Sequence, residues 1–452
     1  MNSEELLDDS DDGKTRLLEG HMSAVDPVSL SDDNHGVDLW NRRSTILWGA
    51  ALFTLTALTY ACRNCMPISA VAMSTEFGWD KSETGLVLSS FFWGYVTSQI
   101  LSGVLSDRYG GDQVVTMASM IWGPLTIIYP FCAYAFDDKS SQLAFIVVNR
   151  VIFGVMTGFH YPTLTNIAAS RVVKQNRSFF YTVINSGTTV GNILSGSVGS
   201  LLLGYYGWHV SFYLFGTAAT VTSIAIRILL MGKRCLHPCT RIGIPETNRL
   251  SKRQKWTVLF KHRAFWAMVT ASVCITGTYL LMVSWLPTYF EESFPGEKGW
   301  VFNVLPWAIA FTTEFLGGWV ADRLIRSGIS TTATRKFLQT LSSVVAATAF
   351  IFVGQTKCYI TALALVTWAF VIGNLESAAV SVNPVDLAPA HAGAVYGFKN
   401  TCGSLMAFFG VYMSGHLLEY FQSWTAVFTI ASCMSFIGWF VFVLFGTGER
   451  IL

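Results

Sequence analysis

The sequence predicts an all-α membrane protein whose twelve transmembrane helices form two related halves of six. Three observations predict this fold class: an apolar composition, twelve apolar runs of spanning length, and one short motif that recurs at the same place in each half. Of the 452 residues, 52% are hydrophobic and 13% are charged, whereas soluble domains carry about 25% charged residues. The formal net charge of +2 is too small to indicate a nucleic-acid partner.

The apolar runs set the number of helices, because about 20 apolar residues cross the hydrocarbon core of a bilayer. Twelve runs are predicted to span, at 44–71, 84–105, 114–136, 143–169, 179–203, 210–231, 264–286, 300–321, 337–353, 359–382, 392–417 and 424–445. They divide the chain into an N-terminal six-helix bundle, residues 44–231, and a C-terminal six-helix bundle, residues 264–447.

Three polar segments lie outside the two bundles. Residues 1–43 form a tail with eleven Asp or Glu among its first 40 residues, which is expected to be disordered. Its leucine pairs at 6–7 and 17–18 resemble endolysosomal sorting signals. Residues 232–263 are predicted to form a basic linker, and residues 448–452 form a short C-terminal tail.

The connecting loops predict the orientation, because cytosolic loops carry an excess of Lys and Arg. The loops after the even-numbered spans hold seventeen Lys or Arg, and those after the odd-numbered spans hold four. Both termini are therefore predicted to be cytosolic.

No constellation in the sequence is typical of an enzyme or of a metal site. Cys235, His237 and Cys239 offer potential ligands on the basic linker without a fourth nearby, so neither a metal nor a cofactor is predicted. No nucleophile with an accompanying base is apparent, so the chain is not expected to be an enzyme.

A repeated motif indicates that the halves arose by duplication. Gly103-Val-Leu-Ser-Asp107-Arg108 follows the second span, and Gly318-Trp-Val-Ala-Asp322-Arg323 follows the eighth, 215 residues later. Each aspartate can hold an arginine or a helix N-terminus across the seam between halves, so the motif is a candidate latch for one access state. A purely structural loop is the alternative.

Two arginines inside apolar runs are the strongest functional signal. Arg63 lies in the first span and Arg150 in the fourth, where a charged side chain costs about 2.5–3.5 kcal/mol on insertion scales. From the expected span ends, both are predicted to lie roughly 10–12 Å below the lumenal face. Two permanent cations in the membrane interior indicate a cavity that receives an anion. The alternative is that each arginine pairs with a buried acid.

Twelve spans with a doubled G-x-x-x-D-R motif resemble the major facilitator superfamily. Three further motifs are similar to the vesicular and phosphate-type organic anion transporters, a family that includes glutamate, sialic acid and nucleotide carriers. These motifs are Phe91-Phe92-Trp93-Gly94-Tyr95, Trp285-Leu286-Pro287-Thr288-Tyr289 and Asn383-Pro384-Val385-Asp386-Leu387-Ala388-Pro389. The runs 66–111 and 290–307 resemble the nucleotide-carrying members most, and the resemblance covers about residues 45–447.

The resemblance implies a fold in which spans 1, 4, 7 and 10 surround a central cavity. It also implies that Arg63 and Arg150 bind the anionic substrate, which two guanidinium groups can hold bidentately. Several aromatic side chains are candidates for stacking on a nucleobase, although most of the 64 aromatic residues in the chain are expected to face lipid or the core. These candidates are Trp93, Phe159, Tyr161, Tyr279 and Trp285.

Two departures from the glutamate and sialic acid carriers bear on coupling. Those carriers have a Glu seven residues after the span 4 arginine, where this chain has Thr157, and a histidine before the Phe-Phe-Trp run, where it has Leu88-Ser89-Ser90. Losing both titratable groups favours uptake driven by membrane voltage over proton symport. His160 is a remaining titratable candidate near the expected cavity, and a packed neutral histidine is the alternative interpretation.

Three charged residues lie inside the C-terminal spans. Glu314, Glu376 and Lys399 fall six or seven residues from the cytosolic ends of spans 8, 10 and 11. A buried ion pair or a gating role is the favoured interpretation, because an unpaired charge there is costly. Proton coupling by a carboxylate of raised pKa and direct substrate contact remain alternatives.

Together these features predict a monomeric vesicular or lysosomal transporter that carries organic anions, most of all nucleotides such as ATP, by voltage-driven alternating access. Chloride is a further candidate partner. One alternative is proton- or cation-coupled transport of sialate, glutamate or phosphate. Another is a membrane sensor or scaffold that keeps the fold without transporting.

Overall fold

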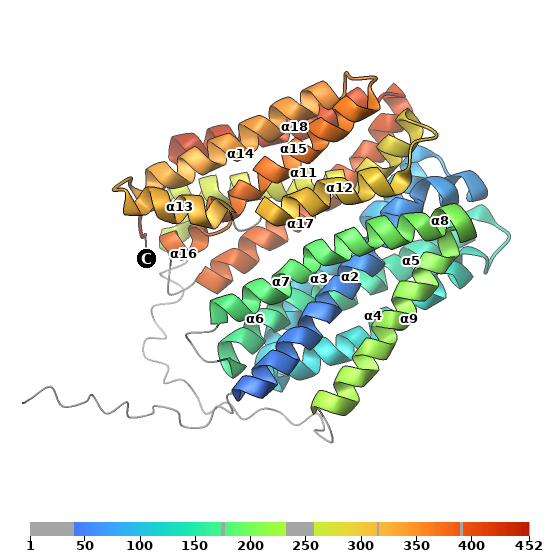
Figure 1. Ribbon diagram of the computed structural model, residues 1–452, viewed down its shortest axis with the longest axis horizontal. Helices are drawn as coiled ribbons and strands as arrows, with labels where there is room; N and C mark the ends of the chain where they lie inside the picture. Colours follow the sequence, from blue (N-terminus) through green and yellow to red (C-terminus); the bar gives the residue numbers. More distant parts are fainter. Residues whose placement is uncertain (1–39, 173–176, 232–256, 314–315, 389–391, 452) are drawn as a thin grey trace, which may run out of the picture. The chain divides into compact units, whose positions relative to one another are not determined.

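The described part of the chain is helical throughout. The computed structural model describes residues 40–172, 177–231, 257–313, 316–388 and 392–451, and no strand occurs within these ranges (Figure 1). All of these residues belong to one compact unit. The leucine pairs of the tail, most of the basic linker with Cys235, His237 and Cys239, and Glu314 lie outside the described ranges.

Helices fill all six expected spans of the N-terminal bundle. They are α2 (Arg42–Phe77), α3 (Lys81–Tyr109), α4 (Gly111–Ala133), α5 (Lys139–Gly158), α6 (His160–Arg171), α7 (Arg177–Leu194), the π-helix η2 (Ser195–Gly199), α8 (Ser200–Tyr206), α9 (Trp208–Ile226) and the π-helix η3 (Arg227–Met231). The fourth span is therefore divided at Phe159 into α5 and α6, and the fifth span contains a π-helical turn.

Helices also fill the six spans of the C-terminal bundle. They are α11 (Arg263–Ser293), α12 (Gly299–Thr313), α13 (Leu316–Arg326), α14 (Thr331–Val353), α15 (Tyr359–Gly373), the 3₁₀-helix η4 (Asn374–Ala378), α16 (Asn383–Leu387), α17 (Ala392–Phe421) and α18 (Trp424–Phe445). The tenth span breaks after α15, where η4 and a turn precede the short α16.

Nine helical stretches within the described ranges are long and apolar enough to cross a membrane. The three remaining expected spans, which are α3, the run from α7 to α8, and α17, are also helical but carry many Gly, Ser and Thr residues that lower their mean hydropathy. Large apolar side chains are exposed on the outer surface, among them Leu229 at 78% and Ile360 at 74%. Such exposure suits contact with lipid.

Local sequence explains where several helices begin. Asp80 accepts a hydrogen bond from the backbone N–H of Glu83, and Glu83 accepts one from the N–H of Asp80, which forms a capping box at the start of α3. Asp138 caps α5 through the N–H of Ser141.

Glycines let neighbouring helices of one half touch through their backbones. A Cβ added at Gly187 or Gly191 of α7 would lie 2.7 Å from the carbonyl oxygen of Phe53 or 2.3 Å from that of Ala57, both on α2. Figure 1 shows α2 and α7 running side by side. Small residues at this spacing allow such close approach, whereas a Cβ added at Gly397 or Gly410 of α17 would meet no atom within 4 Å.

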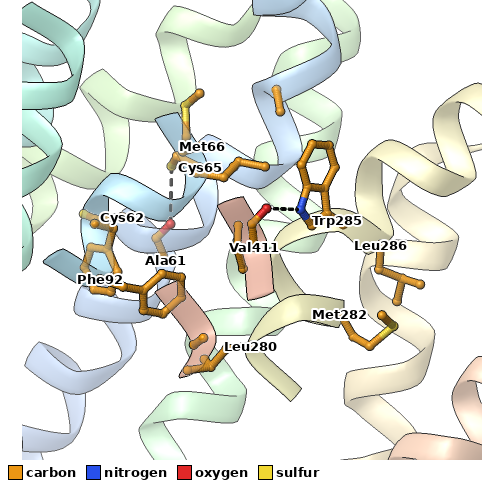
Figure 2. Packing of buried hydrophobic residues seen from close by; sticks show 14 of the residues in the cluster. Ala61, Cys62, Cys65, Met66, Phe92, Leu280, Met282, Trp285, Leu286 and Val411 are labelled. Carbon is orange, nitrogen blue, oxygen red and sulfur yellow. Dashed lines mark hydrogen bonds between the residues drawn. The ribbon is translucent and has the colours of Figure 1, made fainter. Parts of the chain in front are cut away.

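The two halves meet where η2 lies against α12 and where α2 and α3 lie against α11 and α17. Figure 2 shows buried side chains of these helices in one hydrophobic cluster, in which the indole N–H of Trp285 donates to the carbonyl oxygen of Val411 at 3.1 Å. A Cβ added at Gly85 of α3 would lie 3.0 Å from the Cα of Gly415 on α17.

Polar contacts also join the halves at the end where α2 stops and α3 begins, which we call the Lys81 end. The ammonium group of Lys81 forms an ion pair with Glu292 at the end of α11. The backbone N–H of Lys81 donates to Glu419 near the end of α17 at 3.0 Å. We call the opposite end, where α3 stops, the Arg108 end.

Candidate anion-binding site

Arg63 and Arg150 lie far from the helix ends. Helix α2 continues to Phe77 and α5 begins at Lys139, so both helices extend beyond the spans expected from hydropathy. At 1.5 Å per residue, Arg63 is about 21 Å and Arg150 about 16 Å from the ends of their helices at the Lys81 end. Because polar residues continue both helices past the expected spans, these helix ends do not mark the membrane face, and the depth of 10–12 Å below the lumenal face stays a prediction.

The two guanidinium groups share one aromatic ring. The Cζ atom of Arg63 lies 4.6 Å from the ring centroid of Phe91, and that of Arg150 lies 5.5 Å from the same centroid. The two Cζ atoms are therefore at most 10.1 Å apart, the sum of these two distances. Tyr60 and Phe92 also lie within cation–π distance of Arg63, at 5.5 and 5.3 Å.

No carboxylate neutralises this pair within the described ranges. Arg63 is 9% exposed and Arg150 is 4% exposed, and neither has an ion-pair or hydrogen-bond partner there. The buried Nε of Arg150 is left without an acceptor. Burying an unpaired cation costs several kcal/mol, so this part of the molecule is electrostatically suited to receive an anion.

Close packing of α3 on α5 brings Phe91 to Arg150. A Cβ added at Gly154 would lie 2.1 Å from the carbonyl oxygen of Phe91, and one at Gly94 would lie 1.9 Å from that of Val151. The backbones are therefore in direct contact one turn from Arg150. The role of Gly154 was missed by sequence reasoning, although the Gly154-x-x-x-Gly158 spacing is a signal for close helix approach.

Hydroxyl groups surround the neighbouring part of α6. The Tyr161 hydroxyl donates to that of Tyr60 at 2.9 Å and lies 3.0 Å from the Thr188 hydroxyl. His160 is buried, and its Nε2 lies 2.8 Å from the Thr56 hydroxyl. Because that hydroxyl already donates to the carbonyl oxygen of Leu52, Nε2–H of His160 is the donor in this contact, and Nδ1 is left as an acceptor.

The aromatic candidates for nucleobase stacking occupy different environments. Tyr279 is half-buried, and its ring packs edge-on against Trp307 at 5.9 Å and Phe370 at 6.3 Å. Trp285 is fully buried between α11 and α17, and its N–H is bonded to Val411. Phe159 is buried at the break between α5 and α6, where its carbonyl oxygen accepts from Ser102. Trp93 is partly exposed and packs against Phe408 of the other half.

Among the residues that the structure describes, Glu376 and Lys399 form no direct ion pair with each other. Lys399 is buried, and its ammonium group donates to the carbonyl oxygens of Val380 and Ser381, each at 3.4 Å. The Glu376 carboxylate instead accepts from the hydroxyl of Ser381 at 3.1 Å. The turn after η4 places backbone and hydroxyl groups between the two charges, so Ser381 bridges them. Glu314 lies outside the described residues.

The repeated motif does not show the expected latch among the side chains that the structure describes. Asp107 lies near the end of α3, but its side chain is outside the description. Arg108 is exposed and lies 5.3 Å from the ring of Tyr109. Asp322 and Arg323 are exposed on α13. Their gating role stays a prediction.

Two ion pairs near these motifs were missed by sequence reasoning. Asp112 at the start of α4 lies 3.4 Å from Arg171 at the end of α6. In the C-terminal half, Arg335 of α14 is bidentate to Asp386 of α16 at 2.9 and 3.2 Å, and it also donates to the carbonyl oxygen of Ala378. Each pair joins the third and fourth spans of its half. The aspartate belongs to the third span in the N-terminal half and to the fourth span in the C-terminal half. The repeated G-x-x-x-D-R motif indicates that the halves are duplicated, and this was the signal in the sequence from which two corresponding ion pairs could have been predicted.

A small cavity of about 20 Å³ lies between α2, α7, η2, α11 and α12. It is lined by apolar groups and by the amides of Asn64, Asn192 and Asn303. The buried Oδ1 of Asn64 has no partner in the described ranges, and the volume has room for one water molecule. Groups of three or more potential metal ligands do not occur among the described residues.

Comparison with known proteins agrees with this architecture. A sequence profile of the Major Facilitator Superfamily matches residues 52–411. The chain is 34% identical over 428 residues to the voltage-gated purine nucleotide uniporter SLC17A9 of Homo sapiens, covering 94% of this chain and 97% of the human protein. It is 28% identical to the chloroplastic sodium-dependent phosphate transport protein 1 of Arabidopsis thaliana, covering 98% of this chain and 88% of that protein.

A solved structure shows the same fold at low identity. The crystal structure of a bacterial homologue of the human lysosomal transporter Spinster, in an inward-facing and occupied conformation, has a TM-score of 0.72 and 14% identity. The match covers 90% of this chain and 97% of that one. The fold, the profile and the near full-length similarity to the human protein lead to one conclusion. The chain belongs to the Major Facilitator Superfamily, in the same family as the voltage-gated purine nucleotide uniporters.

Proposed function

We propose that this protein is a voltage-driven uniporter that moves purine nucleotides such as ATP into vesicles. The observation that carries the proposal is the pair of buried guanidinium groups, Arg63 and Arg150, which have no carboxylate partner in the described ranges. A phosphate chain supplies the missing negative charge and matches the bidentate geometry of arginine. The similarity to uniporters of purine nucleotides supports this substrate class.

The charge distribution supports the direction of transport. With the basic loops in the cytosol, the Arg108 end is cytosolic and the Lys81 end is lumenal. The contacts of Lys81 with Glu292 and Glu419 then close the lumenal end of the seam between halves. Nucleotide enters from the cytosol, and opening of this end releases it into the lumen.

Membrane voltage provides enough free energy to accumulate the nucleotide in the lumen. A charge that crosses 100 mV gains about 2.3 kcal/mol. A nucleotide with about three net negative charges therefore gains roughly 7 kcal/mol from a lumen-positive potential, which corresponds to about five decades of concentration ratio. No proton relay is required, in agreement with Thr157 at the position where the glutamate and sialic acid carriers have a carboxylate.

Uptake into proteoliposomes tests the proposal. Purified protein is reconstituted, a potassium diffusion potential is imposed with valinomycin, and radiolabelled ATP is followed with and without a pH gradient. Uptake that depends on voltage and is unaffected by the pH gradient is expected. Uptake that requires a proton or sodium gradient, or that favours phosphate, sialate or glutamate over ATP, would overturn the proposal.

Two variants connect this activity to the site. Arg150→Ala should abolish uptake, and Arg150→Lys should leave only a small fraction, because lysine keeps the charge but loses the planar fork. Arg326→Ala changes an exposed arginine of α13 and serves as the matched control. Unchanged uptake in a folded Arg150→Ala protein would rule out this assignment of the site.

A further inference from the structure

We propose that Phe91 is a positioning residue of the anion site, which holds Arg63 and Arg150 at a fixed spacing without neutralising them. This inference rests on the proposed nucleotide transport. It starts from the position of the ring, which lies within cation–π distance of both guanidinium groups at 4.6 and 5.5 Å.

A ring serves this purpose better than a carboxylate. The face of an aromatic ring carries negative potential, so it attracts a guanidinium group without accepting its hydrogen bonds or cancelling its charge. A buried carboxylate would compete with the substrate phosphates for the same N–H donors. Phe91 therefore lowers the cost of two like charges in a buried site while their N–H groups remain available to an anion.

The surroundings of Phe91 fix the ring in place. Its side chain is 1% exposed and packs against Phe92 at 5.3 Å, Tyr95 at 5.5 Å and Phe153 at 5.8 Å. Its carbonyl oxygen is the atom that a Cβ at Gly154 would meet at 2.1 Å. Both the ring and the backbone are thus held by α3 and α5, so the ring has little freedom to leave the two arginines.

The position of the ring also determines how the anion is held. Arg63 comes from α2 and Arg150 from α5, and the two share no described hydrogen bond that would set their separation. Their common contact is Phe91 of α3. Without the ring, no cation–π attraction offsets the repulsion between the two guanidinium groups. The groups then move apart, and their spacing no longer matches one phosphate chain.

Graded fluorination of the ring tests the role of Phe91 with little change of shape. Phenylalanines that carry one, two or three ring fluorines are introduced at position 91 by amber suppression, and the KM and Vmax of voltage-driven ATP uptake are measured. Each fluorine weakens the negative potential of the ring face, so KM should rise stepwise, by roughly 2- to 30-fold over the series, with Vmax much less affected. Inhibition by inorganic pyrophosphate should weaken in parallel, because that probe has only the anionic part of the substrate.

Phe153 provides the matched control. It is a buried phenylalanine that touches Phe91 and Trp122 but lies over neither arginine. Fluorination at position 153 should leave KM unchanged. Phe91→Leu is a second variant that removes the ring while keeping an apolar side chain, and it should raise KM more than Phe153→Leu does.

The outcomes separate this inference from the proposed function. Absence of voltage-driven ATP uptake by the unmodified protein would defeat the function itself. Normal uptake with a constant KM across the series at position 91 would defeat only the role of Phe91. A rise in KM for ATP without a matching loss of pyrophosphate inhibition would also defeat it, because the ring would then act on the nucleoside.

Discussion

The ammonium group of Lys81, the first residue of α3, forms an ion pair with Glu292 near the end of α11. Lys81 and Glu292 belong to different halves, and the backbone N–H of Lys81 adds a second connection to Glu419 of α17. The start of α3 is therefore held from two helices of the other half. These contacts must break for the Lys81 end to open.

Removing both carboxylates should favour an open Lys81 end. Glu292→Gln combined with Glu419→Gln removes the charges that Lys81 and the N-terminus of α3 attract. The side chains of the ion pair are 28% and 30% exposed, so each contact is worth only about 0.2–1 kcal/mol. The two contacts together are worth up to about 2 kcal/mol, so a shift of up to roughly thirtyfold in the ratio of open to closed molecules is expected from the pair of substitutions.

Distances between spin labels at the exposed positions 205 and 297 would report this shift by double electron–electron resonance. Lys139→Ala is the control, because Lys139 pairs with Glu83 at 2.7 Å within one half. Equal distance distributions for the double variant and the unmodified protein would show that these contacts do not hold this end closed.

The close contact of α3 with α5 should not tolerate an added methyl group. Gly154→Ala places a Cβ 2.1 Å from the carbonyl oxygen of Phe91, so the helices must separate. Overpacking of this kind costs about 1–3 kcal/mol and moves Phe91 relative to Arg150. Both thermal stability in detergent and ATP uptake should fall. Gly397→Ala, at a position with no such atom within 4 Å, should leave both unchanged.

Loss of Arg335 should destabilise the C-terminal half. The side chain is 10% exposed, is bidentate to Asp386 and also donates to the carbonyl oxygen of Ala378. Arg335→Ala leaves Asp386 without its partner, at a cost of about 3–5 kcal/mol. Thermal unfolding followed by tryptophan fluorescence should show a clear drop in Tm. The same measurement on Arg323→Ala, which changes an exposed arginine, should show almost none.

A carboxylate at position 157 should make uptake depend on pH. Thr157 is buried on α5, seven residues and so two turns after Arg150, on the same face of the helix. In Thr157→Glu the ionised carboxylate attracts the arginine and competes with the anion, whereas the protonated form does not. ATP uptake by the variant should therefore be weaker at high pH and recover as the pH falls.

Uptake measured at fixed voltage over a range of pH, equal on both sides of the membrane, checks this expectation. Thr157→Gln has a similar size without an ionisable group and should show the pH profile of the unmodified protein. A flat profile for Thr157→Glu would mean that the side chain at position 157 does not reach the anion site.

Much of the fold was predictable because the bilayer imposes its constraints locally. Each expected span contains helix, since a backbone in lipid must satisfy its hydrogen bonds within its own segment. Helix ends were less predictable. Helix α2 continues six residues beyond the expected end, because hydropathy does not register polar residues such as Glu76 that continue a helix into the interface.

The composition of the anion site was predictable in part. Arg63 and Arg150 were evident because a charge in an apolar run is costly wherever the helix packs. The ring between them was not, because the motif Phe91-Phe92-Trp93 indicates a family resemblance but not which of its rings lies against the two arginines. The bridge through Ser381 was equally hidden, since it depends on the break after η4.

By itself, then, the sequence determined that the chain is a duplicated bundle of membrane helices with two buried cations, because span length and desolvation cost depend on each segment alone. Tertiary structure decided which groups face those cations. That choice depends on how closely α3 approaches α5, and the approach is set by glycine contacts between residues far apart in the chain. Only the packed helices bring Arg63, Phe91 and Arg150 together.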